Sequence, residues 1–348
     1  MLALVTATGL AVSGRSWSAP DVRAQIEALI SKSGADVAVA FRTLDGREEL
    51  LIQPDVDYHA ASTMKVPVLV ELFRQARAGT LKLDDQIPVA NQFHSIVDGS
   101  PFTLDVGDDS DADVYKHAGG GMSYRDLAEA MITVSSNFAT NLIIERLGVK
   151  NIQRTTDALG ATGMHVLRGV EDDKAFQKGL NNTTTARALL TLMEAIAKGQ
   201  AVDKASSDEM VAILKRQKFN ERIPAGLPPG IPIAHKTGEI TKIQHDAAIV
   251  YAERPFALVI LVRGLQDSKE GSALAADITR VLHKASQGPA AGLEVRRGDD
   301  HAPGAAYPAA GVAQAFRPAD RDPTAQLLSG LIRIDNTAGI PLRSPDAL

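Results

Sequence analysis

The chain has 348 residues, of which 45% are apolar and 23% are charged, so it can bury the core of a globular protein. Its net charge of −5, from 37 basic and 42 acidic residues, argues against a nucleic-acid binder with a broad basic face. Cysteine is absent, which excludes disulfides, thiol catalysis and zinc–thiolate sites, and the eight histidines form no i, i+4 metal pair. The chemistry must therefore rest on Ser, Lys, Asp and Glu.

The N-terminus has the pattern of an export signal. Residues 1–12 form an apolar run that is too short to span a membrane, and small residues follow it up to Ala19. This pattern predicts a cleaved signal peptide over 1–19, although the usual basic residue before the run is missing. We therefore expect the protein in the periplasm or outside the cell, without a stable membrane span.

The middle of the chain follows a helix period, then a strand period. The predicted elements are, in chain order, a helix over 20–33, a β-hairpin over 37–52, helices over 62–78, 124–134, 137–147, 151–159, 185–198 and 208–217, strands over 231–236, 247–252 and 256–262, and a last helix over 271–284. Strands from both ends of this region must share one antiparallel sheet. The sequence therefore predicts an α+β fold with three αβα layers and a large helical insert, as one domain over 20–285.

The C-terminal segment differs in composition from this domain. Residues 286–348 are rich in Ala, Pro and Gly, contain no lysine and show no sustained period. This composition predicts a mostly disordered tail, in which only 327–334 is apolar enough for a short ordered piece.

The first motif with chemical potential is Ser62-Thr63-Met64-Lys65, at the start of a predicted helix. A lysine one turn after a serine lies on the same helix face, within reach of the hydroxyl. The helix N-terminus supplies N–H groups that favour an oxyanion, and a desolvated lysine can act as a base. Taken alone, the pair is better explained as a serine N-cap followed by a solvated lysine.

Two further motifs occur later in the chain. Ser135-Ser136-Asn137 lies between two predicted helices and offers a hydroxyl that can relay a proton and an amide that can hold a carbonyl. Lys236-Thr237-Gly238 lies on the first strand of the C-terminal meander. There the lysine offers a charge for a carboxylate, the threonine adds a donor, and the glycine is expected to let a ligand lie against the strand edge.

The three motifs occur together in the order helix start, inter-helix loop and sheet strand. S-x-x-K, S-D-N and K-T-G form the signature of serine β-lactamases and penicillin-binding proteins. The chain resembles the class A-like serine β-lactamases over about residues 22–285, and the likeness includes 61–69, 130–142, 182–185 and 235–238.

This resemblance implies a role for each matching residue. Ser62 would be the acylated nucleophile, Lys65 its base, and Ser135 the donor of a proton to the leaving nitrogen. Substrate would be held by Asn137, Lys236 and Thr237, with Gly238 completing the third motif and the backbone N–H groups of Ser62 and Glu239 forming the oxyanion hole. The resemblance implies no metal or organic cofactor, and a small-molecule substrate for a protein that we expect to be a monomer.

The sequence departs from the family pattern at two places. The second motif reads Ser-Ser-Asn, so its middle carboxylate is absent, as in peptidoglycan peptidases. The glutamate that activates the deacylating water is expected four residues before an Asn, but Gln177 and Lys178 stand there. Glu171 is the preferred replacement, with Asp172 and Asp173 as the next candidates.

Other candidates are weaker. The run from Asp105 to Asp113 lacks the glycine and glutamate of a calcium loop, so we interpret it as a solvated acidic loop over the mouth of the site. Tyr115 is expected to line that mouth or to pack in the core. His235 and His245 flank the third motif, and we expect both to be structural.

The sequence thus predicts a serine hydrolase that opens β-lactam rings through an acyl-serine. The close alternative is a penicillin-binding peptidoglycan D,D-peptidase with slow deacylation. A β-lactam receptor is less favoured, because the sequence shows no signalling segment.

Overall fold

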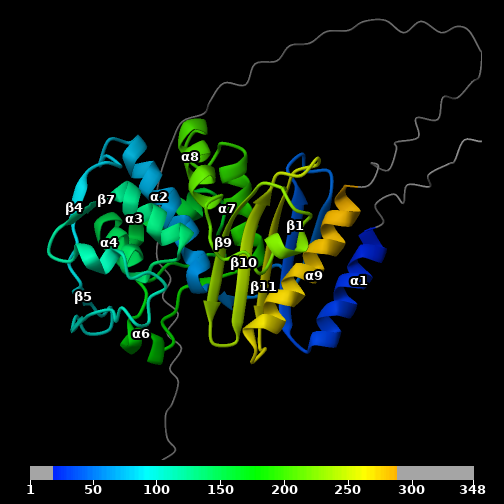
Figure 1. Ribbon diagram of the computed structural model, residues 1–348, viewed down its shortest axis with the longest axis horizontal. Helices are drawn as coiled ribbons and strands as arrows, with labels where there is room; N and C mark the ends of the chain where they lie inside the picture. The colour runs from blue at the N-terminus through cyan, green and yellow to red at the C-terminus, as the bar shows by residue number, and fades with distance from the viewer. Residues whose placement is uncertain (1–18, 288–348) are drawn as a thin grey trace, which may run out of the picture. The chain divides into compact units, whose positions relative to one another are not determined.

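The sheet at the centre of the molecule is built from both ends of the domain. A computed structural model describes residues 19–287 (Figure 1). The five-stranded sheet has the order β2-β1-β11-β10-β9, and each neighbouring pair is antiparallel. Its strands are β1 (Asp36–Thr43), β2 (Glu49–Ile52), β9 (Ile233–Ile240), β10 (Ile243–Val250) and β11 (Phe256–Arg263). The pairing of Asp36 with Arg263 joins the N-terminal hairpin to the C-terminal meander, as predicted.

The two faces of strand β1 carry side chains of different size. On β1, Val37, Val39 and Phe41 face one core, whereas Ala38 and Ala40 face the other. Both sets are fully buried, because helices cover both faces of the sheet. The alternation in β1 is thus one of large and small apolar residues, and the small side chains give the helices on that face room to approach.

Helices form the outer layers (Figure 1). One face of the sheet is covered by α1 (Ala19–Ser33) and α9 (Ser268–Ser286), and the other by α7 (Ala186–Ala197) and α8 (Lys204–Leu214). The remaining helices of the described residues are α2 (Lys65–Arg77), α3 (Tyr124–Thr133), α4 (Asn137–Leu147), α5 (Val149–Ala158) and α6 (Asp173–Gln177). The arrangement confirms the α+β class.

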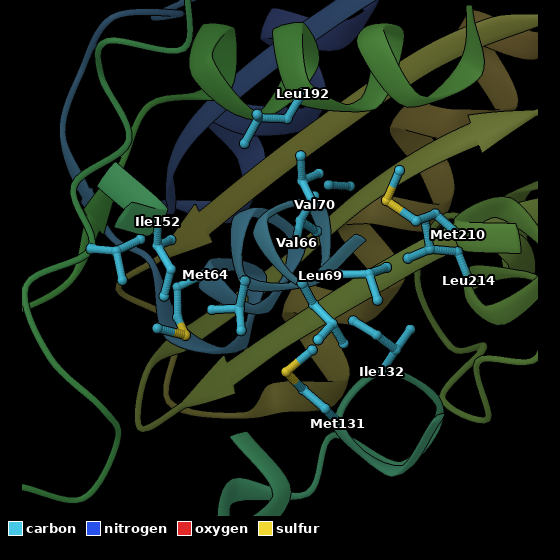
Figure 2. Packing of buried hydrophobic residues seen from close by; sticks show 14 of the residues in the cluster. Met64, Val66, Leu69, Val70, Met131, Ile132, Ile152, Leu192, Met210 and Leu214 are labelled. Carbon is cyan, nitrogen blue, oxygen red and sulfur yellow. The ribbon is translucent and has the colours of Figure 1, made fainter. Parts of the chain in front are cut away.

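Helix α2 lies at the centre of the larger core. Its apolar residues contact α3, α4, α5 and α8, so side chains surround it on several sides (Figure 2). Met64, Val66, Leu69 and Val70 are all fully buried there. Packing on this scale fixes the start of α2, and with it the position of the first motif.

Short elements that the sequence pattern did not predict connect the layers. They are the 3-10 turns η1 (Ala61–Met64), η2 (Val114–His117) and η3 (Pro224–Gly226), and the two-stranded pairs β3 (Tyr58–His59) with β8 (Thr183–Thr184), β4 (Gln86–Pro88) with β7 (Gly121–Ser123), and β5 (Phe93–His94) with β6 (Pro101–Phe102). Strands of two or three residues carry too few positions to show a period.

The expected signal peptide over 1–19 lies outside the described residues except for Ala19, where α1 begins. The expected tail over 286–348, with its piece at 327–334, also lies outside them beyond residue 287. In the part of the chain that the structure describes, no helix has the length and apolar character to cross a bilayer.

Candidate active site

Ser62 lies in the turn η1, directly before α2. Ala61 precedes it with φ +45°, a left-handed conformation that is uncommon for a residue with a side chain. Thr63 Oγ1 donates to the Ala60 carbonyl at 2.6 Å and closes the turn. Within residues 19–287 no hydrogen bond engages the Ser62 hydroxyl, and the residue lines a cleft in the surface.

The Lys65 ammonium lies one turn further along and is fully buried. Its Nζ donates to Asn137 Oδ1 at 2.8 Å, to Ser135 Oγ at 3.1 Å and to the Ser135 carbonyl at 2.6 Å. Burial lowers the pKa of Lys65 to about 7, although the charges of Asp109 and Glu171 oppose this shift. A lysine that is partly neutral at physiological pH can take a proton from a neighbouring hydroxyl.

The Ser135 hydroxyl lies between two lysines. It accepts from Lys65 Nζ at 3.1 Å and from Lys236 Nζ at 3.0 Å. Ser135 has φ +62°, so the turn before α4 holds it in a left-handed conformation. Because two donors occupy the acceptor side of the hydroxyl, its own proton is left to donate into the cleft.

Lys236 is the second lysine that donates to the Ser135 hydroxyl. It is fully buried on β9, and its Nζ also donates to the Thr237 carbonyl at 2.8 Å. Burial, assisted by the charge of Lys65, lowers the pKa of Lys236 well below its ordinary value. Thr237, rather than Lys236, is among the residues that line the cleft.

Glu171 is connected to Lys65 through the side chain of Asn137. Asn137 Nδ2 donates to Glu171 Oε1 at 2.6 Å, while the oxygen of this amide accepts from Lys65. Burial raises the pKa of Glu171, and the hydrogen bond from Asn137 opposes the rise. The structure therefore brings the preferred loop carboxylate beside Lys65 and Ser62.

The loop that carries Glu171 is held by α4. Asn141 accepts from Val170 N at 2.7 Å and donates to the Val170 carbonyl at 3.0 Å. A Cβ at Gly169 would lie 2.4 Å from Asn141 Oδ1, so only glycine permits this approach. Glu171 itself has φ +60°, a strained conformation that these contacts maintain.

The ends of this loop are fastened together by a buried arginine and two amides. Arg168 donates to the Leu180 carbonyl at 2.8 Å and to Asn181 Oδ1 at 3.2 Å. Asn182 Oδ1 accepts from Leu167 N at 2.8 Å, and its Nδ2 donates to the Arg168 carbonyl at 3.0 Å. These hydrogen bonds join residues 167–168 at the start of the loop to residues 180–182 at its end.

The Asp172 carboxylate is engaged in hydrogen bonds with its neighbours. Its oxygens accept from Ser95 Oγ at 2.8 Å, from Ile96 N at 2.9 Å and from Ala175 N at 3.1 Å. It therefore caps α6 and joins the loop to residues 95–96. Asp173 is exposed at the start of α6.

Gly238 also allows a close approach between two parts of the backbone. A Cβ at this position would lie 3.1 Å from Thr63 N and 3.2 Å from Ser62 N. The glycine thus lets β9 approach the backbone of η1. This approach places η1, which contains Ser62, against the segment that contains Glu239.

Arg222 is a residue that the sequence analysis missed. It is buried beside the cleft, where its guanidinium contacts the exposed Glu239 carboxylate, and its Nε has no partner among the described residues. A lone arginine between a turn and η3 carries no pattern, so only its proximity to the third motif could have suggested it.

Two hollows meet at Ser62 to form the cleft. One, of about 280 Å³, is polar and includes Ser135, Thr237 and Arg222 in its lining. The other, of about 360 Å³, lies toward the Glu171 loop and includes the apolar side chains of Phe176 and Ile240. Ser62, Asn137 and Glu239 line both.

The loop from Asp105 to Asp113 is only partly the solvated loop that we predicted. Asp109 is half-buried, and its Oδ1 and Oδ2 accept from Asn137 N at 3.0 Å and from Phe138 N at 2.8 Å. Tyr115 stacks on Phe138 with ring centroids 4.6 Å apart and donates to Asp109 at 3.2 Å. The interpretation of Asp109 as a solvated residue was therefore wrong.

The two flanking histidines lie in the sheet. His245 Nε2 lies 3.0 Å from the His59 carbonyl, and its Nδ1 accepts from Val262 N at 3.1 Å. Burial lowers the pKa of His245 to about 3, so the ring stays neutral. His235 Nδ1 pairs with Asp246 at 3.0 Å, and neither histidine lines the cleft.

Known proteins are similar to this chain in sequence and in fold. The model of the β-lactamase enzyme family matches residues 21–286. A β-lactamase of Bacillus licheniformis is 29% identical over 184 residues, which are 49% of this chain and 58% of that relative. A β-lactamase of Bacillus amyloliquefaciens is 28% identical over 239 residues, which are 66% of this chain and 72% of that relative.

A solved structure is similar over a longer stretch. A variant of PBP-A, in an acyl-enzyme complex with penicillin G, is 28% identical and superposes with a TM-score of 0.65 over 76% of this chain and 96% of that one. Because the family model covers most of the chain, and the three motifs meet in one cleft, this protein belongs to the β-lactamase enzyme family.

Proposed function

We propose that this protein is a serine β-lactamase, which hydrolyses β-lactam rings through an acyl-enzyme on Ser62. The observation that carries the proposal is the chain of contacts from Lys236 through Ser135, Lys65 and Asn137 to Glu171, beside Ser62 in one cleft. The chain supplies a base for forming the acyl-serine and a second base for breaking it.

Acylation uses the two serines and Lys65. Neutral Lys65 takes the proton of the Ser62 hydroxyl as the serine oxygen bonds to the lactam carbonyl carbon. The backbone N–H groups of Ser62 and Glu239 hold the oxyanion. The carbon–nitrogen bond then breaks, Ser135 gives its proton to the nitrogen, and Lys65 returns a proton to Ser135 across 3.1 Å.

Deacylation uses Glu171. The carboxylate removes a proton from a water molecule, whose oxygen bonds to the acyl carbon. The bond from that carbon to the Ser62 oxygen breaks, and this oxygen takes up the proton that Glu171 removed. The raised pKa of Glu171 makes it a stronger base than an ordinary glutamate.

The two hollows suit two parts of a β-lactam. We assign the substrate carboxylate to the polar hollow, where Thr237 and Arg222 line the wall and the buried Lys236 donates to Ser135. The amide of the acyl side chain would meet Asn137, and the side chain itself would enter the hollow beside Phe176 and Ile240. Export through residues 1–19 and a monomeric state remain predictions from the sequence.

Hydrolysis of a chromogenic cephalosporin tests the proposal. The parent protein should hydrolyse it and form a transient mass adduct, and Ser62→Ala should abolish both. Ser272→Ala, on α9 behind the sheet, is the matched control and should behave as the parent. Hydrolysis that survives in Ser62→Ala overturns the proposal, and a lasting adduct without hydrolysis points to a D,D-peptidase.

A further inference from the structure

The start of α4 carries the asparagine on which both halves of the site depend. Asn137 is the first residue of this helix and bonds to Lys65 and Glu171 through its side chain. The second motif has Ser136 in the middle, whose hydroxyl caps Ala139 N at 3.2 Å. A neutral hydroxyl satisfies one N–H of the helix and brings no charge to its positive end.

A carboxylate from another part of the chain occupies this end. The two oxygens of Asp109 accept from the backbone N–H groups of Asn137 and Phe138, which have no partner within the helix. Ser136 Oγ lies 3.4 Å from Asp109 Oδ2, and Ser110 Oγ donates to the Val134 carbonyl at 2.6 Å. The loop thus contacts the Ser135–Asn137 turn on both sides.

The charges around Lys65 come from three further elements. Lys236 on β9 bonds to the same Ser135 hydroxyl, Glu171 belongs to the loop before α6, and Asp109 belongs to the loop before η2. The carboxylates of Asp109 and Glu171 stabilise the charged form of Lys65, while burial disfavours it. Asp109 therefore acts on the proton balance of the site from outside the three motifs.

We propose that Asp109 is a positioning residue of this active site, which fixes the Ser135–Asn137 turn and supplies the negative charge that the Ser-Ser-Asn motif lacks. It acts through Asn137 and Lys65 and does not touch the substrate. The inference rests on the proposed acylation of Ser62.

The sign of a pH shift separates this role from simple support of the turn. If Asp109 supplies charge, its neutralisation makes Lys65 lose its proton more easily. The acidic limb of the plot of acylation rate against pH then moves to lower pH. If Asp109 merely held the turn closed, its loss would admit water, reduce the desolvation of Lys65 and move the limb to higher pH.

The test measures the rate of adduct formation on Ser62 with a penicillin, as a function of pH, for the parent, Asp109→Asn and Asp113→Asn. Asp109→Asn keeps the shape but loses the charge and one acceptor. Its limb should move down by about half a pH unit or more. Its plateau rate should fall about tenfold. Asp113, which is exposed and pairs with Lys116, is the matched control and should match the parent.

A limb of Asp109→Asn that stays in place or moves up, in a protein whose parent forms the adduct, overturns this inference alone. A parent that forms no adduct contradicts the proposed function itself. If Asp109→Asn does not fold, the double variant Asp109→Asn, Ser136→Asp restores a carboxylate at the same helix end. Its limb should coincide with that of the parent, and a displaced limb overturns the inference.

Discussion

The amide nitrogen of Asn137 donates a hydrogen bond to the Glu171 carboxylate at 2.6 Å, while its amide oxygen accepts a hydrogen bond from Lys65 at 2.8 Å. One neutral side chain therefore stands between the two proposed bases. Lys65 and Glu171 do not form an ion pair in this arrangement, and the proposed mechanism assigns the acylation proton to Lys65 and the deacylation proton to Glu171.

The rate of acylation should depend on pH through Lys65. Only the neutral amine accepts a proton, and burial lowers its pKa to about 7. The rate of adduct formation should therefore be low in acid and rise as pH increases through about 7. Rapid mixing with a penicillin, followed by acid quenching and intact-mass measurement between about pH 5 and 9, records this limb. A rate that does not change over this range would show that Lys65 is not the base.

Gly238→Ala should damage acylation through the backbone. The added Cβ would press on Thr63 N and Ser62 N at 3.1 and 3.2 Å, so β9 and η1 must separate by a few tenths of an ångström. We expect a loss of stability of about 1–3 kcal/mol from overpacking. Because two oxyanion donors flank this contact, kcat/KM should also fall by about 10²-fold. Gly230→Ala, in a turn outside the cleft, controls for the loss of a glycine, and equal activity of the two variants would contradict this account.

Arg222→Met should discriminate between substrates. Arg222 lines the hollow proposed for the substrate carboxylate, so kcat/KM should fall by about tenfold or more for a carboxylate-bearing cephalosporin. A methyl ester of the same compound should be much less affected. Arg216→Met, which removes an exposed arginine paired with Glu129, should leave both rates unchanged. Equal losses for the acid and its ester would show that Arg222 acts on the fold and not on the carboxylate.

Asp172→Asn should lower stability without stranding the acyl-enzyme. Asp172 accepts three hydrogen bonds that fix the loop, and asparagine cannot accept all of them. We expect a loss of about 1–2 kcal/mol, which corresponds to a fall in Tm of about 2–8 °C. The pKa of Asp172 is lowered by these bonds, so its contribution is present at neutral pH and is lost as pH falls through the folded-state pKa. An unchanged Tm with a long-lived adduct would instead make Asp172 the deacylation base.

Much of this site could be predicted because its residues lie on regular elements or next to them. The three motifs mark a helix start, an inter-helix turn and a strand, and the hydrophobic periods place those elements in one sheet-and-helix fold. Glu171 could be selected only as one of several loop carboxylates, because its position depends on Asn141 and on an unusual φ. Asp109 and Arg222 could not be predicted, since each reaches the site through irregular backbone that leaves no period in the sequence. The approach of Gly238 to η1 could not be predicted either, because η1 is distant from it in sequence.

In the proposed reaction Ser62 forms an acyl-enzyme, and a water molecule activated by Glu171 then hydrolyses it. The most direct test follows the intact mass of the parent and of Glu171→Gln over time after mixing with a penicillin. The parent should show an adduct that disappears as product forms, and the variant should acylate but hold its adduct about 10²–10⁴-fold longer. A parent that retains its adduct for hours, or a variant that turns over as fast as the parent, would contradict the claim.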